Sequence, residues 1–275
     1  MRFTKVHGAG NDFILIDARK EQEHDYNTLA KRLCHRQTGI GADGLLILNS
    51  SKDADLDMRI INNDGSDAEM CGNGIRCFAK YAYVMGIVAK LEFTVQTGAG
   101  ILVPKIMLDE GGIVSGVRVN MGKPGFLSCE VPVVGEGLCL NRPIEALGEV
   151  FTFSSVRVGN PVTAVEVDDP KTFDVRKYGP AIEKHPYFPE RTNVAFFKVL
   201  DRENVEMRIW ERGAGPTLAC GTGACGTAVL CAKNGLTERK VNIHLELATL
   251  EIEWADDDTV YMTGPAELVF DGDIY

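Results

Sequence analysis

Two short segments place a cysteine directly before a glycine-rich helix start. They are MCGNGIRC at residues 70–77 and ACGTGACG at residues 219–226. In each, Cys-Gly-x-Gly leads into an apolar run long enough to form a helix. A thiol at this position feels the helix macrodipole and the unpaired N–H groups of the first turn, and both favour the thiolate. Cys71 and Cys220 therefore differ from ordinary buried cysteines.

The acidity of such a thiol can be bounded from the sequence. The macrodipole contributes at most ~2 kcal/mol. Since one pKa unit corresponds to ~1.4 kcal/mol, a thiol pKa of ~8.5 would fall to about 7. We therefore expect an appreciable thiolate fraction near neutral pH without a neighbouring histidine. The glycines at positions 72, 74, 221 and 223 also let a ligand approach the backbone, where the N–H groups form an anion site.

A pair of such thiols suggests proton transfer on both faces of one carbon. A thiolate would remove a proton from one face while a thiol returns a proton to the other, which is racemisation or epimerisation by two bases. Two thiolates at close range would repel each other, so the working pair should carry one S⁻ and one SH. The α-proton of an amino acid is weakly acidic. Hydrogen bonds to the substrate carboxylate, where charge accumulates, would therefore be the main electrostatic help.

The cysteine motifs are also compatible with roles outside two-base catalysis. Both thiols could be core residues, since cysteine is often buried. A cysteine hydrolase or transpeptidase needs one cysteine and a histidine, which leaves the second thiol unexplained. GTGACG matches G-x-G-x-x-G, but no aliphatic strand precedes it, so a dinucleotide site is poorly supported. The cysteine spacings do not match zinc ligands, and no metal site is predicted. The remaining cysteines are expected to be small, partly buried apolar residues: Cys34, Cys77, Cys129, Cys139, Cys225 and Cys231.

Composition restricts the class of protein. The chain has 275 residues, 45% of them apolar and 25% charged, which suits two medium domains or one large soluble domain. A net charge of −10 and a pI near 5.1 argue against nucleic-acid and anionic-membrane partners. No apolar run approaches the ~20 residues that cross a bilayer, and the N-terminus lacks the apolar block of a signal peptide. A cytoplasmic protein without a disulfide scaffold is expected.

The chain reads as two equivalent halves. Cys220 lies 149 positions after Cys71, and the same shift superposes Gly10-Asn11 on Gly159-Asn160. Each Gly-Asn pair opens an aliphatic run suited to a strand, at residues 13–16 and 162–165. The glycines after each cysteine and those that end each helical run also coincide under this shift. These gapless matches indicate an internal repeat.

The elements that must position the cysteines are mostly strands. Short β-like runs are expected at 91–108, 112–122, 205–212 and 241–270, and amphipathic helices at 26–36 and 173–185. The runs after the two cysteines are apolar on most sides and end in glycine, so each should be a buried helix. Each half is then a β-structure around one central helix. The predicted halves are residues 1–117 and 118–263, and the pattern leaves open whether the tail, about 264–275, returns to the first half.

Five segments together resemble the diaminopimelate epimerase family. These are HGAGNDF, NNDGSDAEMCGNGIRC, GNP, PERTNVAFF and ERGAGPTLACGTGAC, and the likeness extends from residue 1 to about 272. It implies an α+β fold of two pseudo-symmetric domains, each a mostly antiparallel, barrel-like sheet around a central helix. It also implies a homodimeric cytoplasmic enzyme without a cofactor. That enzyme would interconvert L,L- and meso-diaminopimelate in lysine and peptidoglycan-precursor synthesis.

The resemblance also assigns roles by motif. Cys71 and Cys220 match the catalytic positions, and Glu211 matches a carboxylate that tunes the nearby thiol. Backbone N–H groups that hold the reacting α-carboxylate match Gly72, Asn73, Gly221 and Thr222. Substrate-gripping positions match Asn11, Asn62, Asn160, Asn193 and Arg212. An amide offers both a donor and an acceptor, and a guanidinium binds a carboxylate through two parallel hydrogen bonds.

Two positions depart from the family pattern. Relatives usually read Gly-Asn-Pro-His, whereas this chain has Val162 in place of the histidine. Gly44 stands where some relatives carry a polar side chain that contacts substrate. These departures keep open a related cofactor-independent racemase of another amino acid, such as histidine. The set of residues matching the distal substrate end favours diaminopimelate, because a small amino acid would not need so many partners.

Overall fold

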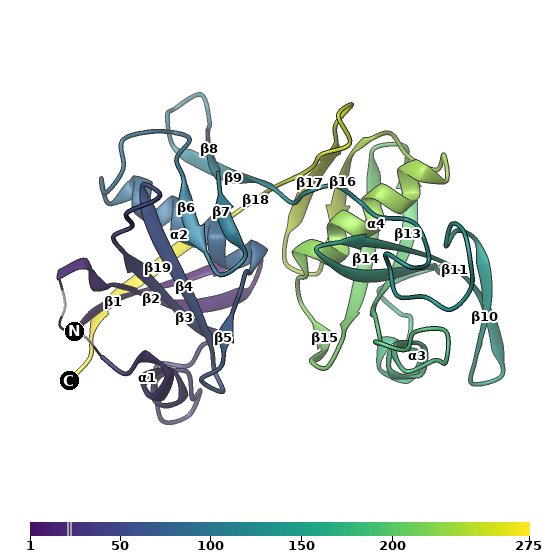
Figure 1. Ribbon diagram of the computed structural model, residues 1–275, viewed down its shortest axis with the longest axis horizontal. Helices are drawn as coiled ribbons and strands as arrows, with labels where there is room; N and C mark the ends of the chain where they lie inside the picture. Colours follow the sequence, from purple (N-terminus) through teal and green to yellow (C-terminus); the bar gives the residue numbers. More distant parts are fainter. Residues whose placement is uncertain (21, 23) are drawn as a thin grey trace. The chain divides into compact units, whose positions relative to one another are not determined.

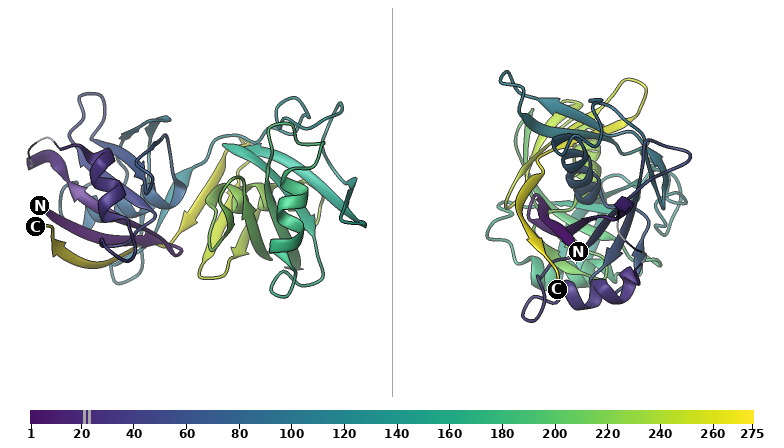
Figure 2. Two further views of the ribbon diagram at one scale, coloured as in Figure 1. Left: turned by 90° about the horizontal axis from the view of Figure 1, so that it is seen from below. Right: turned by 90° about the vertical axis from the view of Figure 1, so that its left-hand side faces the viewer.

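The computed structural model describes residues 1–20, 22 and 24–275 (Figure 1). The chain divides into two compact units. Unit 1 comprises Met1–Val119 and Gly264–Tyr275, and unit 2 comprises Asn120–Thr263. The chain therefore leaves unit 1 and returns to it at the end. Both termini lie side by side in unit 1, where the Met1 amino group donates a 3.2 Å hydrogen bond to the Ile274 carbonyl (Figure 2).

Unit 1 is built on a mixed sheet in the order β19-β1-β2-β3-β4-β6-β7, with β5 paired to β4. The neighbours β2–β3 and β4–β6 run parallel, and the other pairs are antiparallel. A hairpin, β8–β9, follows the sheet. The elements are β1 (Arg2–Gly8), β2 (Asn11–Asp17), the 3-10 turn η1 (Ala18–Lys20), α1 (Tyr26–Leu33), β3 (Gly44–Asn49), β4 (Leu56–Asn62), β5 (Asp67–Ala68), α2 (Gly72–Val84), β6 (Val95–Thr97), β7 (Gly100–Leu102), β8 (Lys105–Leu108), β9 (Val114–Asn120) and β19 (Glu267–Asp273).

Unit 2 repeats this arrangement. Its strands follow the order β10-β11-β12-β13-β14-β16-β17-β18, with β15 paired to β14. Here β12–β13 and β14–β16 are the parallel neighbours. The elements are β10 (Arg142–Ala146), β11 (Glu149–Val158), β12 (Asn160–Glu166), α3 (Val175–Glu183), β13 (Asn193–Asp201), β14 (Asn204–Glu211), β15 (Gly215–Thr217), α4 (Gly221–Lys233), β16 (Lys240–His244), β17 (Thr249–Trp254) and β18 (Val260–Gly264).

The shift of 149 residues connects equivalent elements of the two units. It carries the bounds of β2 onto those of β12, and the bounds of α2 onto those of α4, without any adjustment. The smaller helices, α1 and α3, also share the same N-cap. Asp25 accepts a hydrogen bond from the Thr28 N–H at the start of α1, and Asp174 accepts one from the Lys177 N–H at the start of α3. The internal repeat read from the cysteine motifs thus extends over the whole architecture.

The strands beneath the helices are apolar on both faces, as sheets covered on both sides must be. In β3, Leu45 and Ile47 belong to the buried cluster packed against α1. Leu46, between them, points the other way, and its Cδ2 atom lies 3.2 Å from the position of a Cβ atom built on Gly74 of α2. Alternate residues of one strand thus hold the small helix and the cysteine helix on opposite faces of the sheet.

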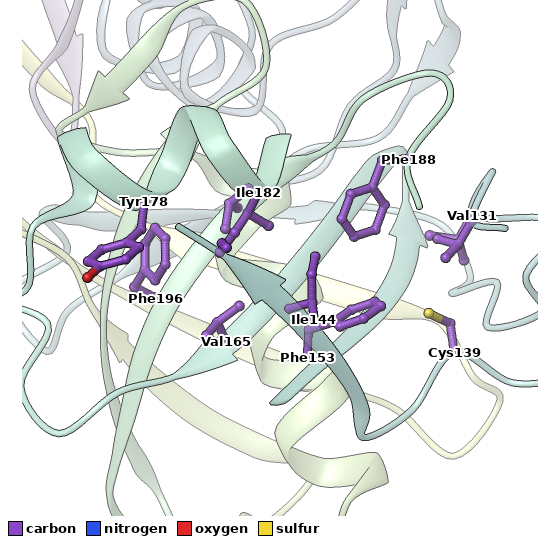
Figure 3. Packing of buried hydrophobic residues seen from close by; sticks show 12 residues of the cluster. Val131, Cys139, Ile144, Phe153, Val165, Tyr178, Ile182, Phe188 and Phe196 are labelled. Atoms are coloured by element: carbon purple, nitrogen blue, oxygen red, sulfur yellow. The ribbon is translucent and has the colours of Figure 1, made fainter. Parts of the chain in front are cut away.

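Unit 2 has the same layering, with an aromatic cluster under α3 (Figure 3). Phe153 and Phe188 meet edge to face, with ring centroids 5.5 Å apart. Phe196 and Tyr178 lie in the same cluster, which includes the buried Cys139. Each fully buried aromatic ring contributes about 1.5–3 kcal/mol of hydrophobic free energy. This packing holds α3 against strands β10 to β13.

The fold class expected from the sequence is confirmed: an α+β protein of two similar units, each with a sheet and a central helix. The helices expected after Cys71 and Cys220 begin at the next residue and are largely buried. The run expected at 91–108 divides into three short strands, β6 to β8, because the chain reverses at residues 97–100. Cys129 was expected to be partly buried and is exposed. No helix in the described ranges is long and apolar enough to cross a membrane.

Candidate active site

Each motif cysteine is the N-cap of its helix. The Cys71 sulfur accepts a hydrogen bond from the Gly74 N–H at 3.4 Å, and the Cys220 sulfur accepts one from the Gly223 N–H at 3.4 Å. The first backbone bonds within the helices are donated by the following residues, at positions 75 and 224. The N–H groups of the two residues after each cysteine therefore have no acceptor within their own helix. A carboxylate fits this position, which combines N–H donors with the positive end of the helix dipole.

Small residues bring the strands of unit 2 close to the cysteine helix. A Cβ atom at Gly223 would lie 2.2 Å from Ile209 Cδ1, and one at Gly226 would lie 2.7 Å from Val162 Cβ. Val162, singled out in the sequence as a departure from the family motif, is fully buried against α4. The valine fills a helix–strand contact with an apolar side chain. Glycine at positions 223 and 226 thus allows Ile209 and Val162 to pack closely against the first two turns of α4.

In unit 1, a short hydrogen-bond network surrounds Cys71. The Asn11 side-chain oxygen lies 3.5 Å from the Cys71 sulfur and accepts a 3.2 Å hydrogen bond from the Asn73 amide. The Asn11 amide nitrogen in turn donates to Asp43 at 2.6 Å. Asp43 fixes which end of the Asn11 amide faces the thiol. The structure thus brings three of the expected site residues together, namely Cys71, Asn73 and Asn11.

The side chain of Asn62 forms its hydrogen bond outside this network. Its amide donates to the Ser66 hydroxyl at 3.0 Å, and its side chain is exposed. Across the sheet Asn62 pairs with Gly44, where a Cβ atom would lie 2.6 Å from the Ile61 carbonyl oxygen. The close backbone approach explains why glycine occupies position 44 here. Asn62 remains at the end of β4, available to a ligand.

In unit 2, the surroundings of the Cys220 thiol disfavour its ionised form. Cys220 is only 6% exposed, and its sulfur lies 3.3 Å from the Thr222 hydroxyl. Burial raises the pKa of the Cys220 thiol well above its ordinary value, and the negative charge of Glu211 adds to the rise. Hydrogen bonds from the Thr222 hydroxyl and the Gly223 N–H lower the pKa of the Cys220 thiol, but by less than burial and Glu211 raise it. The expectation of a thiol pKa near 7 is therefore wrong for Cys220, because desolvation outweighs the helix dipole.

The loop after β14 carries Arg212 and is held by buried polar groups. The Asn193 side-chain oxygen accepts a 2.9 Å hydrogen bond from the Arg212 N–H, while its amide donates to the Pro161 carbonyl at 3.0 Å. Asn193 is 5% exposed and thus braces the backbone of this loop. The Arg212 guanidinium is exposed and donates to the Glu190 carbonyl at 3.0 Å. The other N–H donors of the Arg212 guanidinium remain available to bind a carboxylate.

The Gly-Asn turn of unit 2 also adjoins its cysteine helix. Gly159 has φ +70°, which favours glycine, and its Cβ position lies 3.5 Å from Thr222 Cγ2. Asn160, the next residue, is exposed at the start of β12. It occupies the position that Asn11 occupies in unit 1. Both Gly-Asn pairs thus lie at hairpin turns beside the start of a cysteine helix.

Several residues of the site were missed from the sequence. Asp43 orients Asn11, and the buried Glu183 accepts hydrogen bonds from the Trp210 indole at 2.7 Å and the Gly213 N–H at 3.2 Å. Arg76 is fully buried in α2. One signal was available: an arginine within an otherwise apolar helical run needs internal partners. Within the ranges that the structure describes, no three His, Cys, Asp or Glu side chains form a group that could hold a metal ion.

The effect of the Glu211 carboxylate on the acidity of the Cys220 thiol can be tested by mutation. It accepts a short hydrogen bond from the Thr217 hydroxyl and raises the pKa of the thiol. Replacing Glu211 by glutamine should lower that pKa. At pH 8 the Cys220 thiolate fraction, and with it the rate of labelling by methyl methanethiosulfonate, should rise about three- to tenfold. Peptide mass spectrometry measures the rate, and an unchanged rate would show that Glu211 does not influence the thiol.

The duplicated fold is found in solved structures of low sequence identity. A PhzF-family phenazine biosynthesis protein from Enterococcus faecalis matches with a TM-score of 0.73 and 13% identity over 100% of this chain and 98% of its own. A PhzF-family protein from Bacillus anthracis matches with a TM-score of 0.71 and 16% identity over 100% and 99%. A probable proline racemase from Agrobacterium radiobacter, solved with bound carbonate, matches with a TM-score of 0.64 and 15% identity over 100% and 92%. These likenesses define the class of fold: the two-unit α+β architecture shared with PhzF-family proteins and with a probable proline racemase.

Sequence comparisons then give the particular family. The family model described as "Diaminopimelate epimerase" matches residues 3–127 and 154–269. A diaminopimelate epimerase from Moorella thermoacetica is 51% identical over 276 residues, covering 99% of each chain. Another from Caldanaerobacter subterraneus is 50% identical over 275 residues, covering 100% of this chain and 99% of its own. The chain belongs to the diaminopimelate epimerase family, which confirms the resemblance seen in its motifs.

Proposed function

We propose that the protein interconverts L,L-diaminopimelate and meso-diaminopimelate by moving the α-proton between two cysteines. The observation that carries this proposal is the duplicated helix start, in which each cysteine sulfur caps a helix. Family membership and relatives at about half identity support diaminopimelate as the substrate. Turnover would serve lysine and peptidoglycan-precursor synthesis.

The proposed chemistry requires one base and one acid. Cys71 or Cys220, as thiolate, removes the α-proton, and the other, as thiol, protonates the opposite face of the carbon. The carbanion formed between these steps places negative charge on the α-carboxylate. Donors at a helix start would stabilise that charge without reorganisation, and stabilisation of this kind is usually the largest electrostatic contribution to catalysis. Glu211 would keep Cys220 protonated in the form that acts as the acid.

The proposal also includes the groups that recognise the substrate. We propose that the α-carboxylate is held by the backbone N–H groups at the two helix starts: Gly72, Asn73, Gly221 and Thr222. The remaining polar groups of the substrate would be bound by side chains at strand ends and turns: Asn11, Asn62, Asn160, Asn193 and Arg212. Of these, Asn193 contributes mainly by holding the backbone of Arg212, since both ends of its amide are occupied.

A racemase acting on histidine or another small amino acid is the alternative that Val162 kept open. The relatives at about half identity do not favour it, because their names specify diaminopimelate. Val162 packs against Gly226 in the interior of α4. In this position an apolar side chain has a structural explanation, and no change of substrate is needed to account for it.

Deuterium incorporation tests the two-base proposal. Thiol protons exchange with solvent, so conversion of L,L-diaminopimelate in D₂O should give meso product carrying one deuterium at the inverted carbon. Early in the reaction, recovered substrate should remain unlabelled. Mass spectrometry measures both species. Equal labelling of substrate and product would indicate a single exchanging base, and absence of turnover with diaminopimelate would remove the substrate assignment.

We further propose a cytoplasmic homodimer, with β19 as one contact surface. This strand ends the sheet order of unit 1, and its side chains Val269 and Phe270 are 53% and 51% exposed. An unpaired apolar edge favours association with another chain. Replacing Phe270 by lysine should shift the protein toward monomers in sedimentation velocity. A variant that sediments like the wild-type dimer, or a wild type that is monomeric, would contradict this assignment.

A further inference from the structure

Glu183 is the last residue of α3 and is only 3% exposed. Burial of a charge is strongly unfavourable unless hydrogen bonds replace the lost water. The Arg191 guanidinium lies 3.6 Å from the Glu183 Oε1 atom but is 55% exposed, and an ion pair with a solvated partner compensates only a small part of that cost. The hydrogen bonds that the carboxylate accepts must therefore explain its presence in the interior.

The two oxygens of Glu183 accept hydrogen bonds from the two sides of one short segment. Oε2 accepts from the Trp210 indole N–H at 2.7 Å, and Oε1 accepts from the Gly213 N–H at 3.2 Å. Only Glu211 and Arg212 lie between these donors in the chain, and both belong to the proposed site. One buried carboxylate thus holds this dipeptide from both sides.

The Trp210 ring extends the contact to the hairpin that leads into the Cys220 helix. A Cβ atom on Gly179 would lie 2.6 Å from Trp210 Cγ, so the backbone of α3 lies directly on the indole. The Cβ position of Gly215, in β15, lies 3.6 Å from Trp210 Cη2. The indole therefore connects α3 with the β14–β15 hairpin, and the hydrogen bond to Glu183 fixes the orientation of the ring.

The equivalent positions of unit 1, both within the described ranges, form an apolar contact instead. Under the 149-residue shift, Cys34 stands in place of Glu183 and Ile61 in place of Trp210. Cys34 and Ile61 belong to one buried apolar cluster. The fold thus does not require a charged group at the end of this helix. The carboxylate is found in the unit whose adjoining loop carries Arg212.

We propose that Glu183 is a positioning residue that holds Glu211 and Arg212 together in the places where the reaction needs them. This proposal rests on the proposed function, and it couples two of its parts. Glu211 acts on the Cys220 thiol, and Arg212 binds a carboxylate of the substrate. Without the carboxylate of Glu183, both actions should weaken together, although neither residue has been changed.

The first test needs no turnover and follows labelling of Cys220 by methyl methanethiosulfonate at pH 8. In Glu183→Met the Glu211 carboxylate is no longer held, so the labelling rate should rise about three- to tenfold, as expected for Glu211→Gln. In the double variant the two effects should not multiply, because both remove the same influence on the thiol. A rise of equal size in the Glu211→Gln background would show general opening of the site and overturn the proposal.

The second test separates KM from kcat with diaminopimelate as substrate. Glu183→Met should raise KM about tenfold, because Arg212 loses its fixed position. In an Arg212→Met background the same replacement should leave KM unchanged. Glu183→Gln keeps one acceptor oxygen but brings an N–H group against a donor, so its KM should lie between those of wild type and Glu183→Met. Independent, multiplying effects of Glu183→Met and Arg212→Met would contradict a positioning role.

Glu206→Met is the matched control for both tests. Glu206 is also a buried glutamate of unit 2, lies on β14 as Trp210 does, and pairs with Lys171 at 2.6 Å. Its replacement removes a buried carboxylate without releasing the Glu211–Arg212 dipeptide. Cys220 labelling and KM should therefore remain those of wild type, whereas effects as large as those of Glu183→Met would assign them to lost stability.

Thermal unfolding identifies a variant that does not fold. If Glu183→Met fails to fold, Glu183→Gln takes its place, with the same non-multiplying pattern expected at smaller size and independent effects overturning the proposal. A wild type that is inactive on diaminopimelate but shows the coupling of Glu183 and Glu211 in labelling would remove the proposed function alone. An active wild type whose Glu183 variants label and turn over normally would remove the positioning role alone.

Discussion

Replacing Cys71 or Cys220 by serine should lower kcat for epimerisation by about 10³-fold or more. A hydroxyl caps a helix at least as well as a thiol, so the helix starts should persist. Its much higher pKa, however, removes the base in one direction and the acid in the other, and general acid–base steps contribute about 10²–10⁴-fold each. Both single variants should be defective in both directions, because each direction uses both groups.

Cys129 supplies the matched control for these variants. It is exposed and lies outside the helix starts, so Cys129→Ser should retain wild-type turnover. Activity is measured by chromatography of the two isomers in each direction, with unfolding midpoints to confirm that all variants fold. Wild-type activity in Cys71→Ser or Cys220→Ser would contradict the two-base mechanism.

The second large effect is expected at Arg212. Its exposed guanidinium is carried on a loop whose backbone is braced by Asn193 and Glu183, and we expect it to bind a substrate carboxylate through two parallel hydrogen bonds. Hydrogen bonds to charged groups are worth about 1.5–3 kcal/mol, so Arg212→Met should reduce kcat/KM about 10- to 150-fold, mainly through KM. Arg212→Lys should recover only part of this loss, because an ammonium group cannot form two parallel bonds.

The control for Arg212 is Arg202→Met in the same unit. Arg202 pairs with Glu238 at 2.6 Å, and this replacement should leave KM unchanged. A substrate analogue that lacks the distal carboxylate separates the two ends of the molecule. If Arg212 binds that distal group, wild type and Arg212→Met should turn over the analogue equally. An unaltered KM for diaminopimelate in Arg212→Met would exclude a role in binding.

Much of the fold could be predicted because its repeat is written in the sequence without gaps. The two Cys-Gly-x-Gly motifs and the two Gly-Asn pairs share one shift, and that shift carries α2 onto α4 and β2 onto β12. The apolar character of the cysteine helices predicted their burial. The order of the strands could not be predicted in the same way, because pairing between β4 and β6, or β14 and β16, joins segments separated by a helix.

The sequence by itself determined which thiols stand at helix starts, since local patterns set where a helix begins and which side chain caps it. Only the tertiary structure decided what surrounds each thiol. Burial and Glu211 raise the pKa of the Cys220 thiol, against the helix dipole that the sequence indicated. Arg76 and Asn73 reach Cys71 through Asn11, which lies 60 residues away in the chain. Desolvation and hydrogen bonding depend on residues distant in sequence, so local motifs cannot supply them.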